Sequence, residues 1–397
     1  TTCKKIRLYH NILFLIGFIY YLLLPLWIVV QGAFGDYPGM KSVYQYFSFD
    51  YVLSYCIIVT IFFISFYLGS FLPLKFIKKE RSKPSIDLII SSRDLFIISL
   101  PFFFLGQYTI MANAGNLFQG YLVEYDDGFM GTISTINMVF LFLYIYSKGK
   151  LNVKNYFIDL YLVSSLVEFS IILLGMGSRM YILIPCVTCT LYFLDKGVIS
   201  IKKVLVGGLI AVLFFLFIGI WRLGDSGFSI DSFLYIGIAE PVFTWISVES
   251  MFSSNELPLI AMPYNFFSSF LNFVPTLLFP NKAEFIQPIT LNYDNPFGAT
   301  SLLVSLIANF GILGSCFVLF LLGFFLTSLR LNGRTLFTKT YYYCICGIIP
   351  FQLFRDSIPI VNKMLFYNFL LFPFLLFSIE KLLCKKSIEV SYDENNS

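Results

Sequence analysis

Long apolar runs recur along the whole chain, separated by short segments that carry most of the charged residues. A helix needs roughly 20 apolar residues to cross a bilayer, and runs of about this length predict ten spans. Their approximate limits are residues 10–30, 51–74, 95–112, 129–146, 156–176, 180–194, 204–221, 301–329, 340–354 and 361–380. The pattern therefore predicts an all-α, polytopic membrane protein with about ten transmembrane helices, organised as one integral membrane domain over residues 1–397.

Composition agrees with this class of protein. The chain is 58% apolar and only 13% charged, which excludes an ordinary soluble domain. It has no P-loop and no glycine-rich dinucleotide fingerprint, so neither a nucleotide cofactor nor a nucleic-acid partner is expected.

The basic residues predict the orientation. With ten spans, 21 of the 27 Lys and Arg residues fall in segments on one side of the membrane. Cytoplasmic loops carry the excess of basic residues, so both termini are predicted to be cytoplasmic. The other six are Lys41, Arg179, Arg222, Lys282, Arg355 and Lys363, all predicted to face the outside.

One outer connection is much longer than the others and covers residues 223–300. Its first part predicts an interfacial helix, capped by Asp231 or Ser232 and kinked before Pro241. Residues 265–282 are rich in Phe and suit a segment that lies on the membrane or dips into it. The following span is long enough to tilt, or to break near Gly311.

Three of the outer basic residues are arginines at predicted helix ends. Guanidinium groups offer several donors to phosphate oxygens, so Arg179, Arg222 and Arg355 are candidate catalytic residues around an anionic leaving group. Lys282 is a weaker substrate-binding candidate. The alternatives are an arginine that reaches the lipid headgroups, a counter-ion such as Glu168 for Arg179, and a structural pair of Arg355 with Asp356.

Outer carboxylates, Asp294 among them, are candidates for a general base. Glu249 is the predicted base, because burial on the interfacial helix would raise its pKa toward a useful value. Glu240 and Asp225 are candidate substrate-binding residues. No metal site is predicted, although an alternative is a divalent cation held by Glu124, Asp126 and Asp127. The single histidine, His10, lies at the predicted cytoplasmic end of the first span, so an outer histidine nucleophile or zinc site is excluded.

Several local patterns, in this order, resemble one family. They are GSRM at 177–180, FVPTLLFPNK at 273–282, FGATSLLVSLIANFGILGS at 297–315 and RDSIP at 355–359, combined with one large outer loop in the second half. In these features the chain resembles the Wzy-type O-antigen or oligosaccharide repeat-unit polymerases. It departs from the family pattern at Thr276, where a basic residue is often present.

The resemblance implies an activity and a location. Polymerases of this family transfer a growing glycan from undecaprenyl pyrophosphate to the non-reducing end of a lipid-linked repeat unit, at the periplasmic face of the bacterial inner membrane. The expected partners are undecaprenyl-pyrophosphate-linked glycans, membrane lipid and a chain-length regulator protein, and no cofactor is expected. The alternatives are an O-antigen ligase, which typically carries an outer histidine, and a lipid-linked oligosaccharide flippase or transporter. A membrane O-acyltransferase would need a reactive histidine with an Arg/Asp pattern, which the surroundings of His10 do not provide.

Overall fold

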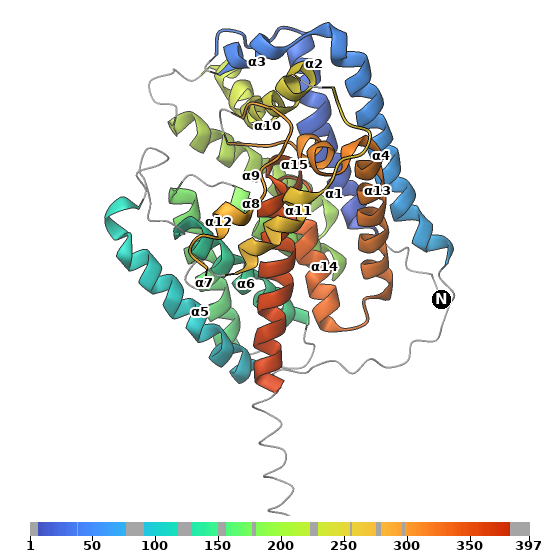
Figure 1. The fold of residues 1–397 in the computed structure, drawn as a ribbon. Helices are drawn as coiled ribbons and strands as arrows, with labels where there is room; N and C mark the ends of the chain where they lie inside the picture. Colours follow the sequence, from blue (N-terminus) through green and yellow to red (C-terminus); the bar gives the residue numbers. More distant parts are fainter. Residues whose placement is uncertain are drawn as a thin grey trace, which may run out of the picture. The chain divides into compact units, whose positions relative to one another are not determined.

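Helices make up most of the part of the chain that the structure describes (Figure 1). The computed structural model describes residues 7–37, 39–76, 91–117, 129–149, 156–176, 180–222, 229–254, 256–274, 279–295 and 298–381, and no strand occurs among them. Within these described ranges, seven helices are long and apolar enough to cross a membrane: Tyr9–Val30, Phe49–Lys75, Arg93–Ala112, Phe129–Gly149, Tyr156–Gly175, Leu302–Asn332 and Ile358–Lys381. These confirm a polytopic membrane protein, while the count of ten spans and the orientation stay predictions.

The other three predicted spans also fall on helices, but one of them is interrupted. Helix α8 (Met180–Asp195) is short, and α9 extends over Ile201–Arg222. The predicted span 340–354 is divided into α14 (Leu336–Ile348) and the single turn α15 (Gln352–Arg355), so its expected continuity is wrong. Pro350 explains the interruption, because proline lacks a backbone donor and disfavours helical geometry at the residue before it.

Residue contacts divide the chain into two compact units. The first unit contains Thr1–Arg81, Phe193–Asn332 and Ile348–Asn362, and the second contains Ser82–Tyr192, Gly333–Gly347 and Lys363–Ser397. The first unit holds the candidate site. Its described helices are α1 (Tyr9–Phe18), α2 (Leu24–Val30), α3 (Met40–Tyr46), α4 (Val52–Lys75), α9, α10 (Ile230–Ser254), α11 (Tyr264–Ser268), α12 (Lys282–Phe285), α13 (Leu302–Asn332), α15 and α16 (Ile358–Asn362). A π-helical segment, Ile19–Leu23, joins α1 to α2.

In the first unit α4 and α13 pack through glycines. Gly69 of α4 faces the carbonyl group of Phe320, and Gly323 of α13 faces the carbonyl group of Phe66. A side chain at either glycine would overlap that backbone. Small residues let helix backbones approach closely in a membrane, where packing replaces the hydrophobic effect as the driving force for helix association.

Helix α13 is interrupted at Gly311, which is one of the two alternatives that the sequence left open. Gly311 has φ 69° and ψ −178°, a conformation that favours glycine, and the backbone of Ile260 lies directly against it. The amides of Ile312 and Leu313 donate to the carbonyls of Pro258 and Leu259, both at 3.0 Å. The segment after α10 therefore satisfies the backbone donors that the break exposes.

Helix α10 lies where the sequence predicts a helix, but its cap differs. The side chain of Ser229 accepts a hydrogen bond from the amide of Ser232 at 3.0 Å, so Ser229 is the capping residue and the predicted cap at Asp231 or Ser232 is wrong. The side chains of residues 244–251 are all buried within the first unit. Helix α10 can therefore hold polar groups away from water.

The second unit has a helical core of its own. Its helix α6 (Phe129–Gly149) is almost entirely buried, and α5 (Ser92–Ala112) and α7 (Tyr156–Gly175) pack against it. Gln107 of α5 donates to Glu168 of α7 at 2.6 Å. Glu168 thus has an amide partner within the helical core, while Arg179, its predicted counter-ion, lies outside the described residues.

Candidate functional site

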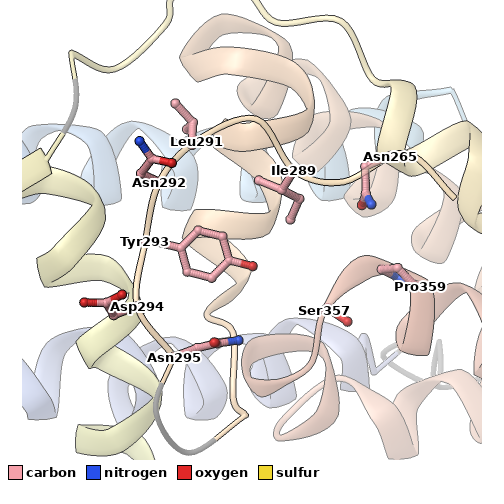
Figure 2. Close-up of a pocket in the computed structure, with 9 residues that line it drawn as sticks. All are labelled: Asn265, Ile289, Leu291, Asn292, Tyr293, Asp294, Asn295, Ser357 and Pro359. Carbon is pink, nitrogen blue, oxygen red and sulfur yellow. The ribbon is translucent and has the colours of Figure 1, made fainter. Parts of the chain in front are cut away.

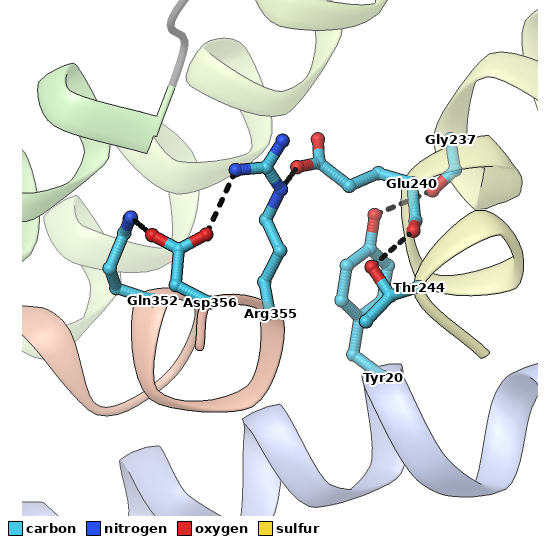
Figure 3. Close-up of polar contacts among 7 residues, drawn as sticks. All are labelled: Tyr20, Gly237, Glu240, Thr244, Gln352, Arg355 and Asp356. Carbon is cyan, nitrogen blue, oxygen red and sulfur yellow. Dashed lines mark hydrogen bonds and ion pairs between the residues drawn. The ribbon is translucent and has the colours of Figure 1, made fainter. Parts of the chain in front are cut away.

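Arg355 lies at the centre of a charged cluster in the first unit, defined here by Arg355, Glu240, Asp356 and Gln352 (Figure 3). Its Nε forms an ion pair with Oε1 of Glu240, and its Nη1 lies 3.1 Å from Oδ1 of Asp356. The other carboxylate oxygen of Asp356 accepts a hydrogen bond from Gln352. The pairing of Arg355 with Asp356 is one of the alternatives that the sequence predicts for this arginine. The contact of Arg355 with Glu240 brings together two residues that the sequence predicts for the site.

Helix α15 is held against the middle of the first span. The ring of Phe354 lies 5.2 Å from that of Phe14 and stacks at 6.3 Å on that of Tyr21. Gly17, one turn from each ring, faces Phe354 and the carbonyl of Pro350, so the absence of a side chain there permits the close approach. Arg355 directly follows Phe354, which places the cluster beside the central third of the helix Tyr9–Val30.

Helix α10 reaches the same place from another direction. The hydroxyl of Tyr20 donates to the carbonyl of Gly237 at 2.7 Å, and Glu240 lies one turn further along α10 (Figure 3). The side chain of Thr244 donates to the Glu240 carbonyl at 2.9 Å. Both partners of the ion pair are therefore anchored on the first span. Charged groups deep inside a membrane protein are costly, and are usually retained for function.

The cluster carries more negative than positive charge. Two carboxylates share the one guanidinium, and the side chains of Arg355 and Glu240 are 27% and 23% exposed whereas that of Asp356 is 6% exposed. Asp356 is the more deeply buried of the two carboxylates. The partial exposure leaves Arg355 and Glu240 accessible to a ligand.

Glu249, the predicted base, is also on α10 but outside this cluster. It lies nine residues after Glu240, about two and a half turns away, and therefore on the other side of the helix. Its side chain is fully buried, Oε1 accepts a hydrogen bond from Tyr51 at 3.5 Å, and Oε2 has no hydrogen-bond partner among the described residues. Burial raises its pKa to about 9, and the Tyr51 hydrogen bond lowers it only partly. Glu249 is thus a neutral acid at pH 7.

The remaining predicted site residues are less informative. Lys282 begins α12 and donates to the carbonyl of Val274 at 2.7 Å, and desolvation lowers its pKa. Arg222 is the last residue of α9, and its side chain lies outside the described part of the chain. Arg179, Asp225 and the acids Glu124, Asp126 and Asp127 also lie outside it.

A polar pocket lies beside the turn that carries Arg355 (Figure 2). Its volume is about 680 Å³, and it is lined by Asn265, Ile289, Leu291, Asn292, Tyr293, Asp294, Asn295, Ser357 and Pro359. Of these, sequence reasoning had singled out only Asp294, among the outer acids. The signal it passed over is the run of four polar residues 292–295, followed at a distance by Ser357 directly after Arg355 and Asp356.

Within the described ranges, no group of three or more His, Cys, Asp or Glu side chains is placed to hold a metal ion. His10 is fully buried against the hydroxyls of Ser70 and Thr327, at 3.2 and 3.0 Å, rather than near the charged cluster. Comparison of the chain with protein-family models, with curated proteins and with solved structures finds no match in any of the three.

Proposed function

We propose that the protein is a membrane glycosyltransferase of the polymerase type, which transfers a growing glycan from undecaprenyl pyrophosphate to the non-reducing end of a lipid-linked repeat unit. The observation that carries this proposal is the Arg355–Glu240 ion pair, partly exposed and anchored beside the middle of an apolar helix. It places a group that can bind a diphosphate next to a group that can accept a proton, in a region of low polarity.

The reaction needs both groups. The acceptor hydroxyl oxygen attacks the anomeric carbon, the bond from that carbon to the diphosphate oxygen breaks, and the electron pair leaves with the diphosphate. Arg355 stabilises the charge that develops on this leaving group. Glu240 accepts the proton of the hydroxyl. No metal ion is required in this scheme, since the leaving group already carries its phosphates and is met by a guanidinium.

The ion pair also suggests how the site is prepared. Without substrate, Arg355 is neutralised by Glu240 and Asp356. A diphosphate binds a guanidinium through a bidentate fork, and can replace Glu240 as the partner of Nε. That exchange frees Glu240 as a base only when the donor is in place. Arg179, Arg222 and Lys282 are proposed as further donors around the diphosphate.

The proposed base differs from the first choice made on sequence. Glu249 would have to lose a proton in a fully buried position, with a pKa of about 9. Glu240 is partly exposed and already beside Arg355. Glu240 is therefore the better placed carboxylate, and the catalytic role of Glu249 stays a prediction to be tested with it.

The proposed location is the bacterial inner membrane, with the site open to the periplasm. The distribution of basic residues along the sequence supports this orientation. A second candidate function is a flippase or transporter of lipid-linked oligosaccharides. It is favoured by the depth of the charged cluster, since ion pairs at mid-span are typical of transport pathways.

A reconstituted system distinguishes the polymerase from the flippase or transporter. The full chain in nanodiscs is given a lipid-linked repeat unit, and the products are separated by length while released undecaprenyl pyrophosphate is measured. We expect a ladder of polymers, and a loss of turnover of roughly 10²–10⁴-fold in Glu240→Gln with donor binding retained. The control is Glu256→Gln, the same change at an exposed glutamate. Transbilayer movement of the lipid in proteoliposomes without any polymer would establish the transporter instead.

A further inference from the structure

The pocket beside Arg355 has a lining that is polar but almost without charge. Asp294 is the one acidic side chain among its nine residues, and none is Lys, Arg or His. Figure 2 shows the carboxylate of Asp294 turned away from the pocket, and it accepts a hydrogen bond from Tyr46. The groups that remain toward the pocket are amides, hydroxyls and short apolar surfaces. A phosphate or another anion would find no cation here.

Asn265 offers an unused acceptor at this pocket. Its Nδ2 donates to the carbonyl of Gln287 at 2.6 Å, which fixes the orientation of the amide. Its Oδ1 is buried and has no hydrogen-bond partner among the described residues. A buried acceptor without a partner costs free energy, and a ligand donor that reached it after a shift of the neighbouring side chains would recover that free energy.

The opposite wall holds a ring. Tyr293 turns its side chain into the middle of the pocket, between Ile289 and Ser357 (Figure 2). Its aromatic face can cover the apolar face of a pyranose ring while amide groups bond to the hydroxyls at the edge. The volume of about 680 Å³ is within the range of roughly 300–1,000 Å³ typical of small-molecule sites.

The pocket is joined to the charged cluster through the backbone. Ser357 lines the pocket and lies two residues after Arg355. The amide of Thr300 donates to the carbonyl of Arg355 at 3.0 Å, and Asn295 of the pocket lies 3.4 Å from the hydroxyl of Thr300. The pocket and the turn that carries Arg355 therefore belong to the same part of the first unit.

We propose that this pocket binds uncharged, hydroxyl-rich sugar residues. It is a subsite separate from the charged cluster, with the Asn265 amide as acceptor and Tyr293 as the stacking ring. Its identification with the acceptor end of the glycan rests on the proposed function, whereas the chemistry of the ligand follows from the lining itself. In this arrangement the charged cluster binds the diphosphate, and the pocket binds the sugar that carries the attacking hydroxyl.

The test uses the full chain in nanodiscs and a defined probe. The probe is the repeat-unit oligosaccharide that accumulates in host cells lacking this protein, released from its lipid and dephosphorylated. We expect binding whose affinity is unchanged between low and high salt, since no ion pair is formed. Asn265→Leu and Tyr293→Ala should each weaken binding by about tenfold, the effect of one lost hydrogen bond or stacking contact. The matched control Asn332→Leu, at the exposed end of α13, should bind as the unchanged protein does.

Thermal unfolding curves of Asn265→Leu and Tyr293→Ala show whether each variant is folded. Weaker binding by a folded variant reports the loss of a contact rather than the loss of the fold. The pocket proposal is overturned if the probe does not bind, or if neither folded variant changes its affinity. It is also overturned if inorganic pyrophosphate competes with the probe for the pocket. If the probe binds in a way that depends on Asn265 and Tyr293 but no polymer forms, the pocket proposal holds and the proposed polymerase activity is wrong. If polymer forms and both variants have an unchanged KM for the acceptor, the polymerase proposal holds and the pocket proposal is wrong.

Discussion

Arg355 and Glu240 form an ion pair although they lie on separate helices far apart in the sequence. Each is fixed by its own contact with the helix Tyr9–Val30: the turn of Arg355 through Phe354, and α10 through the bond from Tyr20 to Gly237. A guanidinium held in this way has lost part of its conformational freedom before any ligand arrives. Preorganised charge of this kind is what stabilises a developing anion best.

The first prediction concerns the geometry of that charge. Arg355→Gln should lower polymer formation by roughly 10²–10³-fold, because a leaving group in a region of low polarity loses its main donor. Arg355→Lys should recover little activity, since an ammonium group cannot form the bidentate fork. Arg179→Ala and Arg222→Ala are expected to lose long-chain polymer as well. Polymer length in cells and turnover in nanodiscs are the measurements.

Arg93→Gln is the matched control for Arg355→Gln, because Arg93 is an exposed arginine in the first turn of α5. Its polymer should be normal. Full-length polymer in the variants of Arg355, Arg179 and Arg222 alike, at normal protein level, would show that no guanidinium meets the diphosphate.

The second prediction concerns pH. The folded chain holds Glu249 with a pKa of about 9, against an ordinary value of 4.5. Between these two values the folded state binds one proton more than the unfolded state, so the free energy of unfolding falls as the pH rises, by up to about 1.4 kcal/mol per pH unit. Below pH 4.5 both states are protonated and the effect is absent. Glu249→Gln should remove this part of the slope, as measured by thermal unfolding in detergent from pH 5 to 9.

Glu256→Gln, at an exposed position, should leave the slope unchanged. An equal slope in the Glu249→Gln variant would mean that Glu249 is already ionised in the fold. The same variant tests the catalytic prediction: a base would lose roughly 10²–10⁴-fold in turnover, and full activity removes Glu249 from the mechanism.

The positions of the helices were predictable because membrane insertion is decided locally, by the apolar character of about 20 consecutive residues. The break at Gly311 was one of two alternatives, because glycine within a long apolar run permits a break but the length of the run also suits a tilted helix. The interruption after Ile348 also has a local cause, Pro350, but the surrounding run is apolar enough to predict a continuous span.

The site was less predictable, because it depends on which distant segments meet. Sequence placed Arg355 and Glu240 on the same side of the membrane, but their contact arises from two elements that dock separately on the first span. The burial of Glu249 follows from its neighbours on the span Phe49–Lys75, where Tyr51 donates to it and Tyr55 accepts from Trp245 at 3.0 Å. The pocket residues are asparagines and a serine in irregular segments, a composition that is ordinary for loops.

The third prediction concerns metal ions. Activity should survive EDTA, because in the proposed scheme arginine side chains take the role that a divalent cation has in other diphosphate sites. Turnover in nanodiscs with and without EDTA is the measurement, with a metal-dependent glycosyltransferase as a positive control for chelation. A loss of activity that Mg²⁺ or Mn²⁺ restores would contradict the scheme, and would direct attention to Glu124, Asp126 and Asp127.

The last prediction concerns the packing that holds the first unit together. Gly69→Leu and Gly323→Leu should each destabilise the protein by at least about 1–3 kcal/mol, because the new side chain meets backbone rather than a movable side chain. Gly207→Leu is the matched control: it lies on an apolar helix too, with no atom of another residue near its position and an exposed face. Thermal unfolding in one detergent, with the yield of folded protein, compares the three. Equal unfolding temperatures for all three variants would show that α4 and α13 do not approach at these glycines.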